Sequence, residues 1–105
     1  MHNTSNFLIN FCPTGAINTK QDNPALPITV DKIINDCNTA MEMGCQMLHL
    51  HARCERGEQT GDPAVYREII TRLRATTLGQ KAIICVTTTG RHQNDPESRA
   101  RVSVA

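Results

Sequence analysis

The chain has 105 residues, which allows at most one domain with a modest hydrophobic core. Its 11 Lys and Arg against 10 Asp and Glu leave a net charge of +1, so no large basic surface is available to bind nucleic acid. Hydrophobic residues make up 39% and charged residues 20% of the sequence, which is typical of a folded globular chain and not of a disordered one.

The first part of the chain predicts a strand followed by a helix. Residues 7–12 are mostly apolar and end at Pro13, which stops a strand. The helix is predicted at 30–43, with Thr29 as its N-cap and Gly44 where a C-terminal cap belongs. Its apolar residues recur at three-and-four spacing, so we expect one buried face.

The same order is repeated twice more. A strand is predicted at 45–51, a helix at 63–75 begins with Pro63 after the N-cap Asp62, and a third strand is predicted at 81–87. A further helix should start near residue 96. This order predicts an α/β fold whose parallel strands are joined by crossover helices. The nearly continuous apolar strands indicate a sheet covered on both faces. No linker divides the chain, so residues 1–105 form one unit.

Two histidines at the end of the second strand are the sharpest functional feature. Because alternate strand residues point to the same face, His49 and His51 should project together while Leu48 and Leu50 face the helices. Active sites of α/β folds lie at such strand ends, and two neutral imidazoles suit Zn²⁺. The alternative is a pair of histidines that make ordinary hydrogen bonds, and the short spacing alone leaves both interpretations open.

Three further residues are candidate substrate contacts. Arg53 could hold a carboxylate or phosphate at the mouth of the site, or it could be a solvated loop charge. Thr87 and Thr89 end the third strand, where hydroxyl groups could bind a carboxylate or carbonyl oxygen or simply cap the next segment. No glycine-rich nucleotide-binding motif is present, so dinucleotide or nucleoside-triphosphate binding has no support.

Membrane insertion and disulfide bonding are not expected. The apolar run 7–16 is interrupted by Asn10 and Pro13 and is too short and too polar for a membrane span. It also has no basic leader, which a signal peptide would have. Five cysteines, an odd number without a C-x-x-C pair, favour free thiols in a reducing compartment. We therefore expect a cytoplasmic protein that binds neither nucleic acid nor a membrane.

Taken together, the motifs resemble those of the β-keto acid cleavage enzyme family, of the 3-keto-5-aminohexanoate cleavage enzyme type. They occur in family order with family-like spacing and cover nearly the whole chain. The matching stretches are Thr14-Gly15-Ala16, Asn23 to Thr29, Leu48 to Arg53, Asp62-Pro63 with Tyr66 to Ile70, and the Thr-rich turn Thr87 to Gly90.

The resemblance implies a partial (β/α)₈ TIM barrel, of which this chain is the N-terminal portion with the first three β/α units. It implies a divalent metal, usually Zn²⁺, held by His49 and His51. The implied reaction takes a β-keto acid and acetyl-CoA, as small-molecule partners, to acetoacetate and a new acyl-CoA. The family's substrate-contacting hydroxyl maps to Thr87, while Thr89 replaces a glycine of the family's turn. A homo-oligomer is also expected.

The departures from the family pattern limit what this chain is expected to do. Ile17 stands where some members have a Glu that binds the amino group of an amino-keto acid, so the implied substrate is another β-keto acid. The family's carboxylate metal ligand, and the Arg and Asp that drive cleavage, come from later strands of a barrel of about 250 residues. We assign no catalytic residue to this chain and expect activity only in the full-length barrel. The alternative expectation is a truncated, non-catalytic remnant that at most binds metal weakly and self-associates through open sheet edges.

Overall fold

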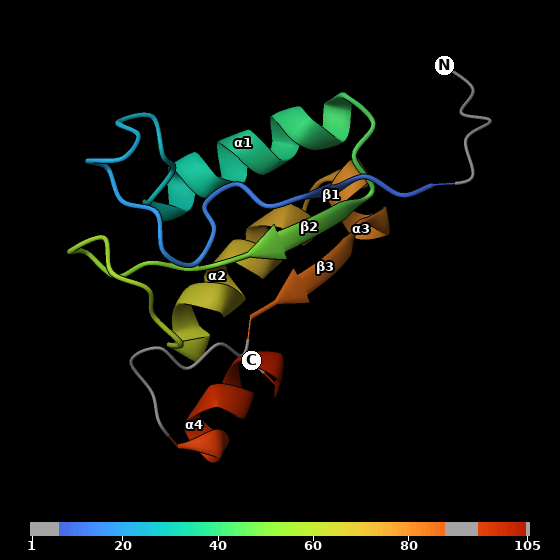
Figure 1. The fold of residues 1–105 in the computed structure, drawn as a ribbon. Coiled ribbons are helices and arrows are strands. Elements are labelled where there is room, and N and C mark those ends of the chain that lie inside the picture. Colours follow the sequence, from blue (N-terminus) through green and yellow to red (C-terminus); the bar gives the residue numbers. More distant parts are fainter. Residues whose placement is uncertain (1–6, 88–94, 105) are drawn as a thin grey trace.

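The described residues form a three-stranded parallel sheet with helices packed on it. The computed structural model describes residues 7–87 and 95–104. The strands are β1 (Asn10–Phe11), β2 (Met47–Leu50) and β3 (Ile83–Val86), in the order β1-β2-β3. The helices are α1 (Val30–Glu42), α2 (Pro63–Arg74), α3 (Thr77–Lys81) and α4 (Pro96–Ala100), followed by the 3₁₀-helix η1 (Arg101–Val104) (Figure 1). The predicted α/β class with parallel strands is confirmed.

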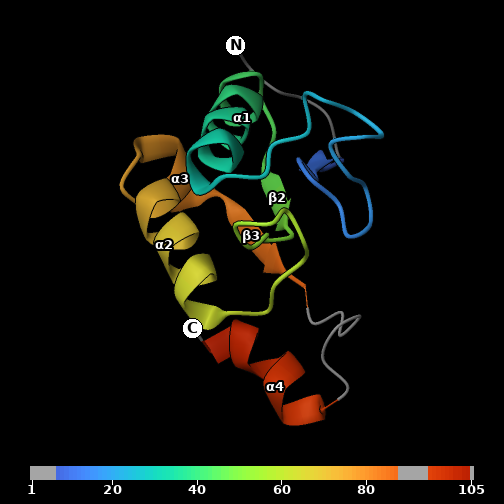
Figure 2. The same ribbon diagram turned by 90° about the vertical axis from the view of Figure 1, so that its left-hand side faces the viewer.

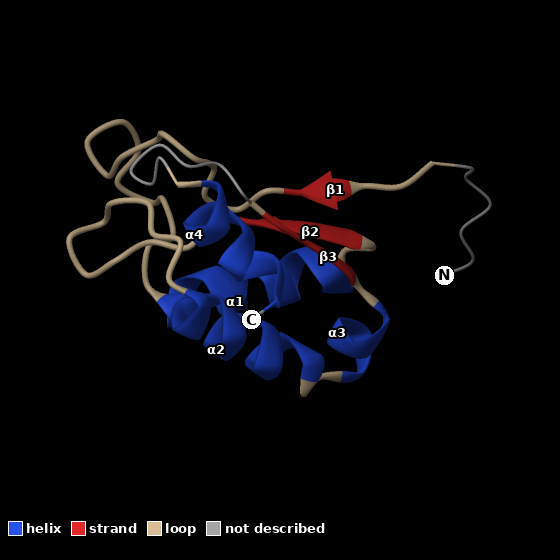
Figure 3. Cartoon of the chain, turned by 90° about the horizontal axis from the view of Figure 1, so that it is seen from below, coloured by secondary structure: helices blue, strands red, loops and turns tan. Residues whose placement is uncertain are grey.

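Among the described residues, helices α1, α2 and α3 lie on one side of the sheet only. Figure 3 shows the strands above these helices, and Figure 2 shows the same helices arranged beside the strands. Along β2, Leu48 and Leu50 are buried beneath the helices, while Met47 and His49 are half-buried. The sequence predicted cover on both faces, and the described part of the chain supplies it on one.

Both long helices begin with the caps that the sequence indicated. The Thr29 side chain accepts a hydrogen bond from the Lys32 N–H at 3.2 Å, which satisfies one of the free donors at the start of α1. At the start of α2, the Asp62 carboxylate accepts from the Ala64 N–H at 3.0 Å, and Pro63 is the first helical residue. These local signals fix where the two helices start and therefore which face each presents to the sheet.

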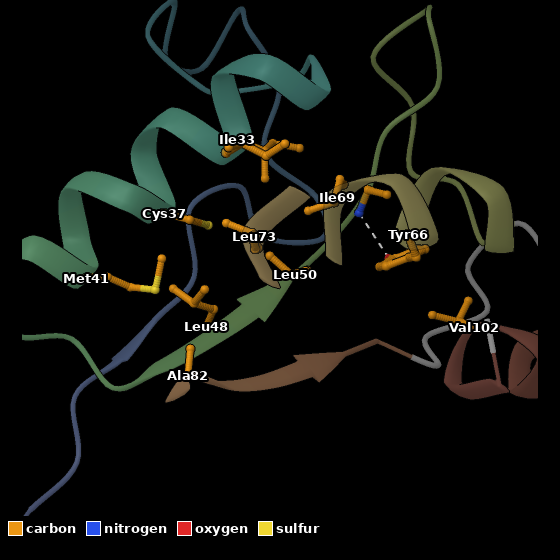
Figure 4. Close-up of a cluster of buried hydrophobic side chains, with 12 residues drawn as sticks. Ile33, Cys37, Met41, Leu48, Leu50, Tyr66, Ile69, Leu73, Ala82 and Val102 are labelled. Atoms are coloured by element: carbon orange, nitrogen blue, oxygen red, sulfur yellow. Dashed lines mark hydrogen bonds between the residues drawn. The ribbon is translucent and has the colours of Figure 1, made fainter. Parts of the chain in front are cut away.

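The hydrophobic core lies between the helices and the covered face of β2 (Figure 4). Fully burying an aliphatic side chain of this kind contributes about 1.5–3 kcal/mol. The side chains with no exposed surface include Cys37, Leu48, Leu50, Tyr66, Ile69 and Leu73. Val102 of η1 also belongs to this cluster, so the last described segment packs on the same core.

Each observed strand lies inside its predicted range and is shorter, and β1 has only two residues. At Ile9, the backbone N–H donates to the side chain of Gln46 at 2.9 Å instead of continuing the ladder. The Ile9 carbonyl still accepts from the Met47 N–H at 3.1 Å. Residues 7–9 carry exposed apolar side chains, so nothing buried fixes their alternation.

Helix α3 is an element that the sequence analysis did not predict, because it left residues 76–80 as a connection between the predicted helix at 63–75 and the predicted strand at 81–87. In the structure Gly79 lies inside α3 and is buried. An added Cβ there would collide with the carbonyl oxygen of Leu73, so the close approach of α3 to α2 requires glycine. The Arg74 side chain secures this turn by donating to the carbonyls of Gly79 and Ala82, each at 2.6 Å.

The structure also bears on the thiols and on membrane insertion. All five cysteines are free. None of the helices in the described ranges is long and apolar enough to cross a membrane.

Candidate functional site

The two histidines lie together at the carboxyl end of β2. His49 is half-buried within the strand, and His51 follows its last residue by one position. Their ring centroids are 4.9 Å apart and the ring planes are tilted by 33°. The alternation of a strand therefore brings the two imidazoles side by side. Leu48, which precedes His49, and Leu50, which lies between the two histidines, are buried in the core.

His51 is in the protonation state that a metal ligand requires. Its residue is only 9% exposed, and its buried Nδ1 has no hydrogen-bond partner among the described residues. Burial lowers the pKa of His51, and electrostatic repulsion from the neighbouring His49 and Arg53 lowers it further. The imidazole is consequently neutral near pH 7 and keeps a lone pair for a cation.

The two histidines fit a metal as part of a ligand set. Within residues 7–87 and 95–104, no group of three or more His, Cys, Asp or Glu side chains is arranged to hold a metal ion. An orphaned nitrogen on a neutral imidazole next to a second imidazole suits two positions of a zinc site.

Strand β3 places two more side chains next to the histidines. Cys85 is the register partner of His49, so the two residues are direct neighbours on adjacent strands. Thr87 follows Val86, the partner of Leu50, and is therefore at the level of His51; it is buried. Sequence analysis singled out Thr87 but missed Cys85, which an alignment of the two parallel strands by their ends would have suggested. Thr89 lies outside the described residues.

Arg53 is buried and ties three loop positions together. Its Nη1 donates to the carbonyls of Asn18 at 3.0 Å and Gly57 at 2.9 Å, and its Nη2 donates to the carbonyl of Gly15 at 2.8 Å. Its Nε is buried without a partner among the described residues. Burial lowers the pKa of this guanidinium, but an arginine stays charged at any physiological pH. The interpretation of Arg53 as a solvated loop charge is therefore wrong.

The loops that Arg53 connects border a cavity of about 380 Å³. Gly15, within the Thr14-Gly15-Ala16 motif, has φ of 75°, a conformation that favours glycine. Ile17 and Lys20 from this loop line the cavity, and Arg56 and Glu58 from the opposite turn line it as well. The apolar side chain of Ile17 therefore forms part of the wall of the cavity between these two loops.

Tyr66 links helix α2 to the segment that carries the histidines. The hydroxyl of this fully buried side chain accepts a hydrogen bond from the Ala52 N–H at 3.0 Å, drawn as a dashed line in Figure 4. Sequence analysis named Tyr66 only within a stretch that resembles the family. A general rule could have indicated this contact, because a buried tyrosine hydroxyl usually finds a hydrogen-bond partner.

Comparison with known proteins identifies relatives of the chain. Residues 6–105 match the model of the family described as beta-keto acid cleavage enzyme. The chain is 39% identical over 84 residues to 3,5-dioxohexanoate:acetyl-CoA acetone transferase of Paraburkholderia graminis, covering 79% of this chain and 26% of that protein. It is 38% identical over 60 residues to 3-keto-5-aminohexanoate cleavage enzyme of Fusobacterium nucleatum subsp. nucleatum, covering 57% of this chain and 22% of that protein.

A third relative is 3-oxoadipate:acetyl-CoA acetyltransferase of Cupriavidus necator, at 32% identity over 84 residues, with 80% of this chain and 29% of that protein covered. The chain thus spans about a quarter of the length of these curated relatives. The family match covers nearly every residue of the chain, including the paired histidines and the loops around them. The chain belongs to the β-keto acid cleavage enzyme family.

Proposed function

We propose that this chain contributes metal- and substrate-binding residues to an enzyme that converts a β-keto acid and acetyl-CoA into acetoacetate and an acyl-CoA. The proposal rests on one observation above all, the adjacent and partly buried imidazoles of His49 and His51 at the end of β2. The names of two relatives, 3,5-dioxohexanoate:acetyl-CoA acetone transferase and 3-oxoadipate:acetyl-CoA acetyltransferase, support acetyl-CoA as the co-substrate.

His49 and His51 would hold a divalent cation, Zn²⁺ by the family resemblance. When bound, such a cation supplies Lewis-acid polarisation of the keto carbonyl. The chain's own contribution is to keep His51 neutral by burial and to hold it next to His49. Further ligands and the groups that drive cleavage would come from outside the described residues, so no catalytic residue is assigned to this chain.

Thr87 and Thr89 are the proposed substrate contacts. Thr87 follows the last residue of β3 at the level of His51, where its hydroxyl can donate to a carboxylate or carbonyl oxygen of a keto acid. Ile17 at the cavity wall cannot bind an ammonium group, which supports a β-keto acid without an amino group there. Arg53 was a third predicted substrate contact, and its hydrogen bonds to Gly15, Asn18 and Gly57 support a different role, argued below.

The proposal includes the architecture of the whole protein. Three parallel strands with helices on one side match the first units of a (β/α)₈ barrel, in which the uncovered side would face the interior. Placement of the histidines on that side, near the carboxyl ends of the strands, agrees with where such barrels keep their active sites. A homo-oligomer in the cytoplasm completes the proposal.

A binding titration tests the metal assignment directly. The purified chain, treated with a chelator and then titrated with Zn²⁺ in competition with a coloured indicator, should bind the metal. The His49→Ala and His51→Ala variants should each weaken that affinity at least tenfold, because each removes a ligand. Cys54→Ser is the matched control, because Cys54 lies near the histidines in sequence but is not among the proposed ligands. Unchanged affinity in both histidine variants would refute the metal site.

A chimera tests the reaction. The isolated chain should form no acetoacetate from acetyl-CoA and a panel of β-keto acids, since the cleavage groups are not assigned to it. The same residues, placed in the P. graminis relative in exchange for the segment that they match, should support acetoacetate formation. The His51→Ala version of this chimera should lose that activity. A folded, zinc-loaded but inactive chimera would favour the alternative of a non-catalytic remnant.

A further inference from the structure

Two buried side chains hold the backbone directly after His51. Tyr66 accepts from the N–H of Ala52, the next residue, and Arg53, the residue after that, donates to the carbonyls of Gly15, Asn18 and Gly57. Tyr66 has no exposed surface and Arg53 is 7% exposed. The segment leaving β2 is therefore anchored to helix α2 on one side and to two loops on the other.

The anchor at Arg53 is unusual in its electrostatics. No carboxylate of the described residues forms an ion pair with the guanidinium, and its acceptors are all backbone carbonyls. A buried charge without a counter-charge is costly unless its hydrogen bonds are good, and bonds from a charged donor are stronger than neutral ones. Removing the fork-shaped guanidinium would release Gly15 and Asn18 of the loop after β1 at the same time as the segment after β2.

The ring of His51 lacks the support that metal-binding histidines usually have. Such a ring is normally oriented by a hydrogen bond from its second nitrogen to a carboxylate or carbonyl. Among the described residues the His51 ring donates no hydrogen bond, and its ring contact is with the imidazole of His49. The backbone of the segment is therefore left to set the direction of the imidazole.

We propose that Tyr66 and Arg53 are positioning residues that fix the backbone at His51, so that its imidazole stays next to that of His49 as half of a metal-binding pair. The inference rests on the proposed metal site and adds the two residues that hold it in shape. Neither side chain touches the metal or the substrate in this arrangement, and both act through the peptide that follows His51.

Conservative variants of the chain test this role. Tyr66→Phe keeps the buried ring and removes only the hydroxyl, and Arg53→Lys keeps the charge and removes the fork. Each should weaken Zn²⁺ affinity about tenfold, the effect expected when support behind a ligand is lost. The Co²⁺-loaded variants should also show altered visible absorption, because the ligand geometry changes. Titrations are run at a temperature at which circular dichroism shows every variant folded.

Ile69→Val is the matched control, because it trims a fully buried side chain of the same helix that has no bond to the histidine segment. It should leave the Zn²⁺ affinity and the Co²⁺ spectrum unchanged even though it loosens the core. Wild-type affinity and spectrum in both Tyr66→Phe and Arg53→Lys would overturn the inference. So would an equal loss in Ile69→Val, because the effect would then be one of general stability.

A second measurement does not depend on the metal. In the metal-free chain, NMR relaxation dispersion of the His51 and Ala52 backbone amides should show added exchange in Tyr66→Phe and not in Ile69→Val. Failure of the wild-type chain to bind Zn²⁺ would refute the proposed metal site, while the relaxation data would still decide whether Tyr66 fixes this backbone. Identical relaxation in wild type and Tyr66→Phe would overturn the positioning role whatever the metal result.

Discussion

The two faces of strand β2 show how one short segment serves two purposes. On the covered face, Leu48 and Leu50 have no exposed surface and are held by α1, α2 and the core. On the other face, His49 is half-buried and lies against His51, with no helix of the described residues above it. The residues of the covered face pack in the core, and those of the other face carry the candidate functional groups. Substitutions on β2 should therefore fall into two groups: those on the covered face should destabilise the fold, and those on the other face should remove a proposed metal ligand.

The largest expected effect is on the covered face. Leu50→Ala should lower the free energy of unfolding by about 2–5 kcal/mol, because it removes buried methyl groups and leaves a cavity in a packed core. His49→Ala, one residue away on the other face, should change it by about 0.5 kcal/mol or less. Urea unfolding of the metal-free variants, followed by circular dichroism, measures both. A larger loss in His49→Ala than in Leu50→Ala would break the division between the faces.

Sequence patterns predicted the features of the fold that arise from local rules. Strand alternation placed Leu48 and Leu50 in the core and the histidines opposite them, as the structure has it. The N-caps Thr29 and Asp62 marked the starts of the two long helices. Helix α3 was not predicted, because the need for Gly79 arises from the nearby Leu73 carbonyl and not from any local pattern. The family membership expected from the motifs is confirmed.

The site was predictable only in part, for a similar reason. His-Leu-His is a local spacing, and it led directly to the adjacent imidazoles of His49 and His51. The bonds of Arg53 to Gly15 and Asn18 join residues 38 and 35 positions apart, and a sequence pattern does not show such partners. Tyr66 and Ala52 are 14 positions apart and belong to different elements. The ligand candidates were therefore visible in the sequence, and the groups that hold them in place were not.

Two thiols allow the two faces of the sheet to be compared in the unsubstituted chain, with a smaller expected effect. Cys37 in α1 lies fully buried on the covered face, and Cys85 in β3 is the half-buried neighbour of His49. Burial, reinforced by the negative charge of Asp36, raises the pKa of Cys37 to about 12. Since the thiolate is the reactive form, Cys37 should react with iodoacetamide at pH 8 at least about tenfold more slowly than Cys85. Site-resolved mass spectrometry measures both rates in one sample.

The same thiol predicts how stability changes at alkaline pH. The pKa of Cys37 is about 12 in the folded chain against 9.0 for an ordinary thiol, so the unfolded chain loses the proton first. Stability should be intact below pH 9 and fall as the pH rises from 9 towards 12. Cys37→Ala should flatten this part of the curve. An unchanged alkaline slope in Cys37→Ala would contradict the burial of this thiol. So would labelling of Cys37 as fast as Cys85 in the native chain. Labelling in 6 M guanidinium, where both thiols should react at the same rate, is the control.

The smallest expected effect concerns His51 at acid pH. Its pKa is lowered in the folded chain by burial and by the charges of His49 and Arg53, so the unfolded chain, with an ordinary value near 6.5, takes up the proton more readily. Stability of the metal-free chain should therefore be fully present above pH 6.5 and decrease as the pH falls through and below that value. Urea unfolding between pH 7.5 and 5 should show this slope in the wild type and a flatter one in His51→Gln. The same acid slope in both proteins would mean that His51 is as accessible to protons in the folded chain as in the unfolded one, and the contrast between its buried imidazole and an ordinary surface histidine would be lost.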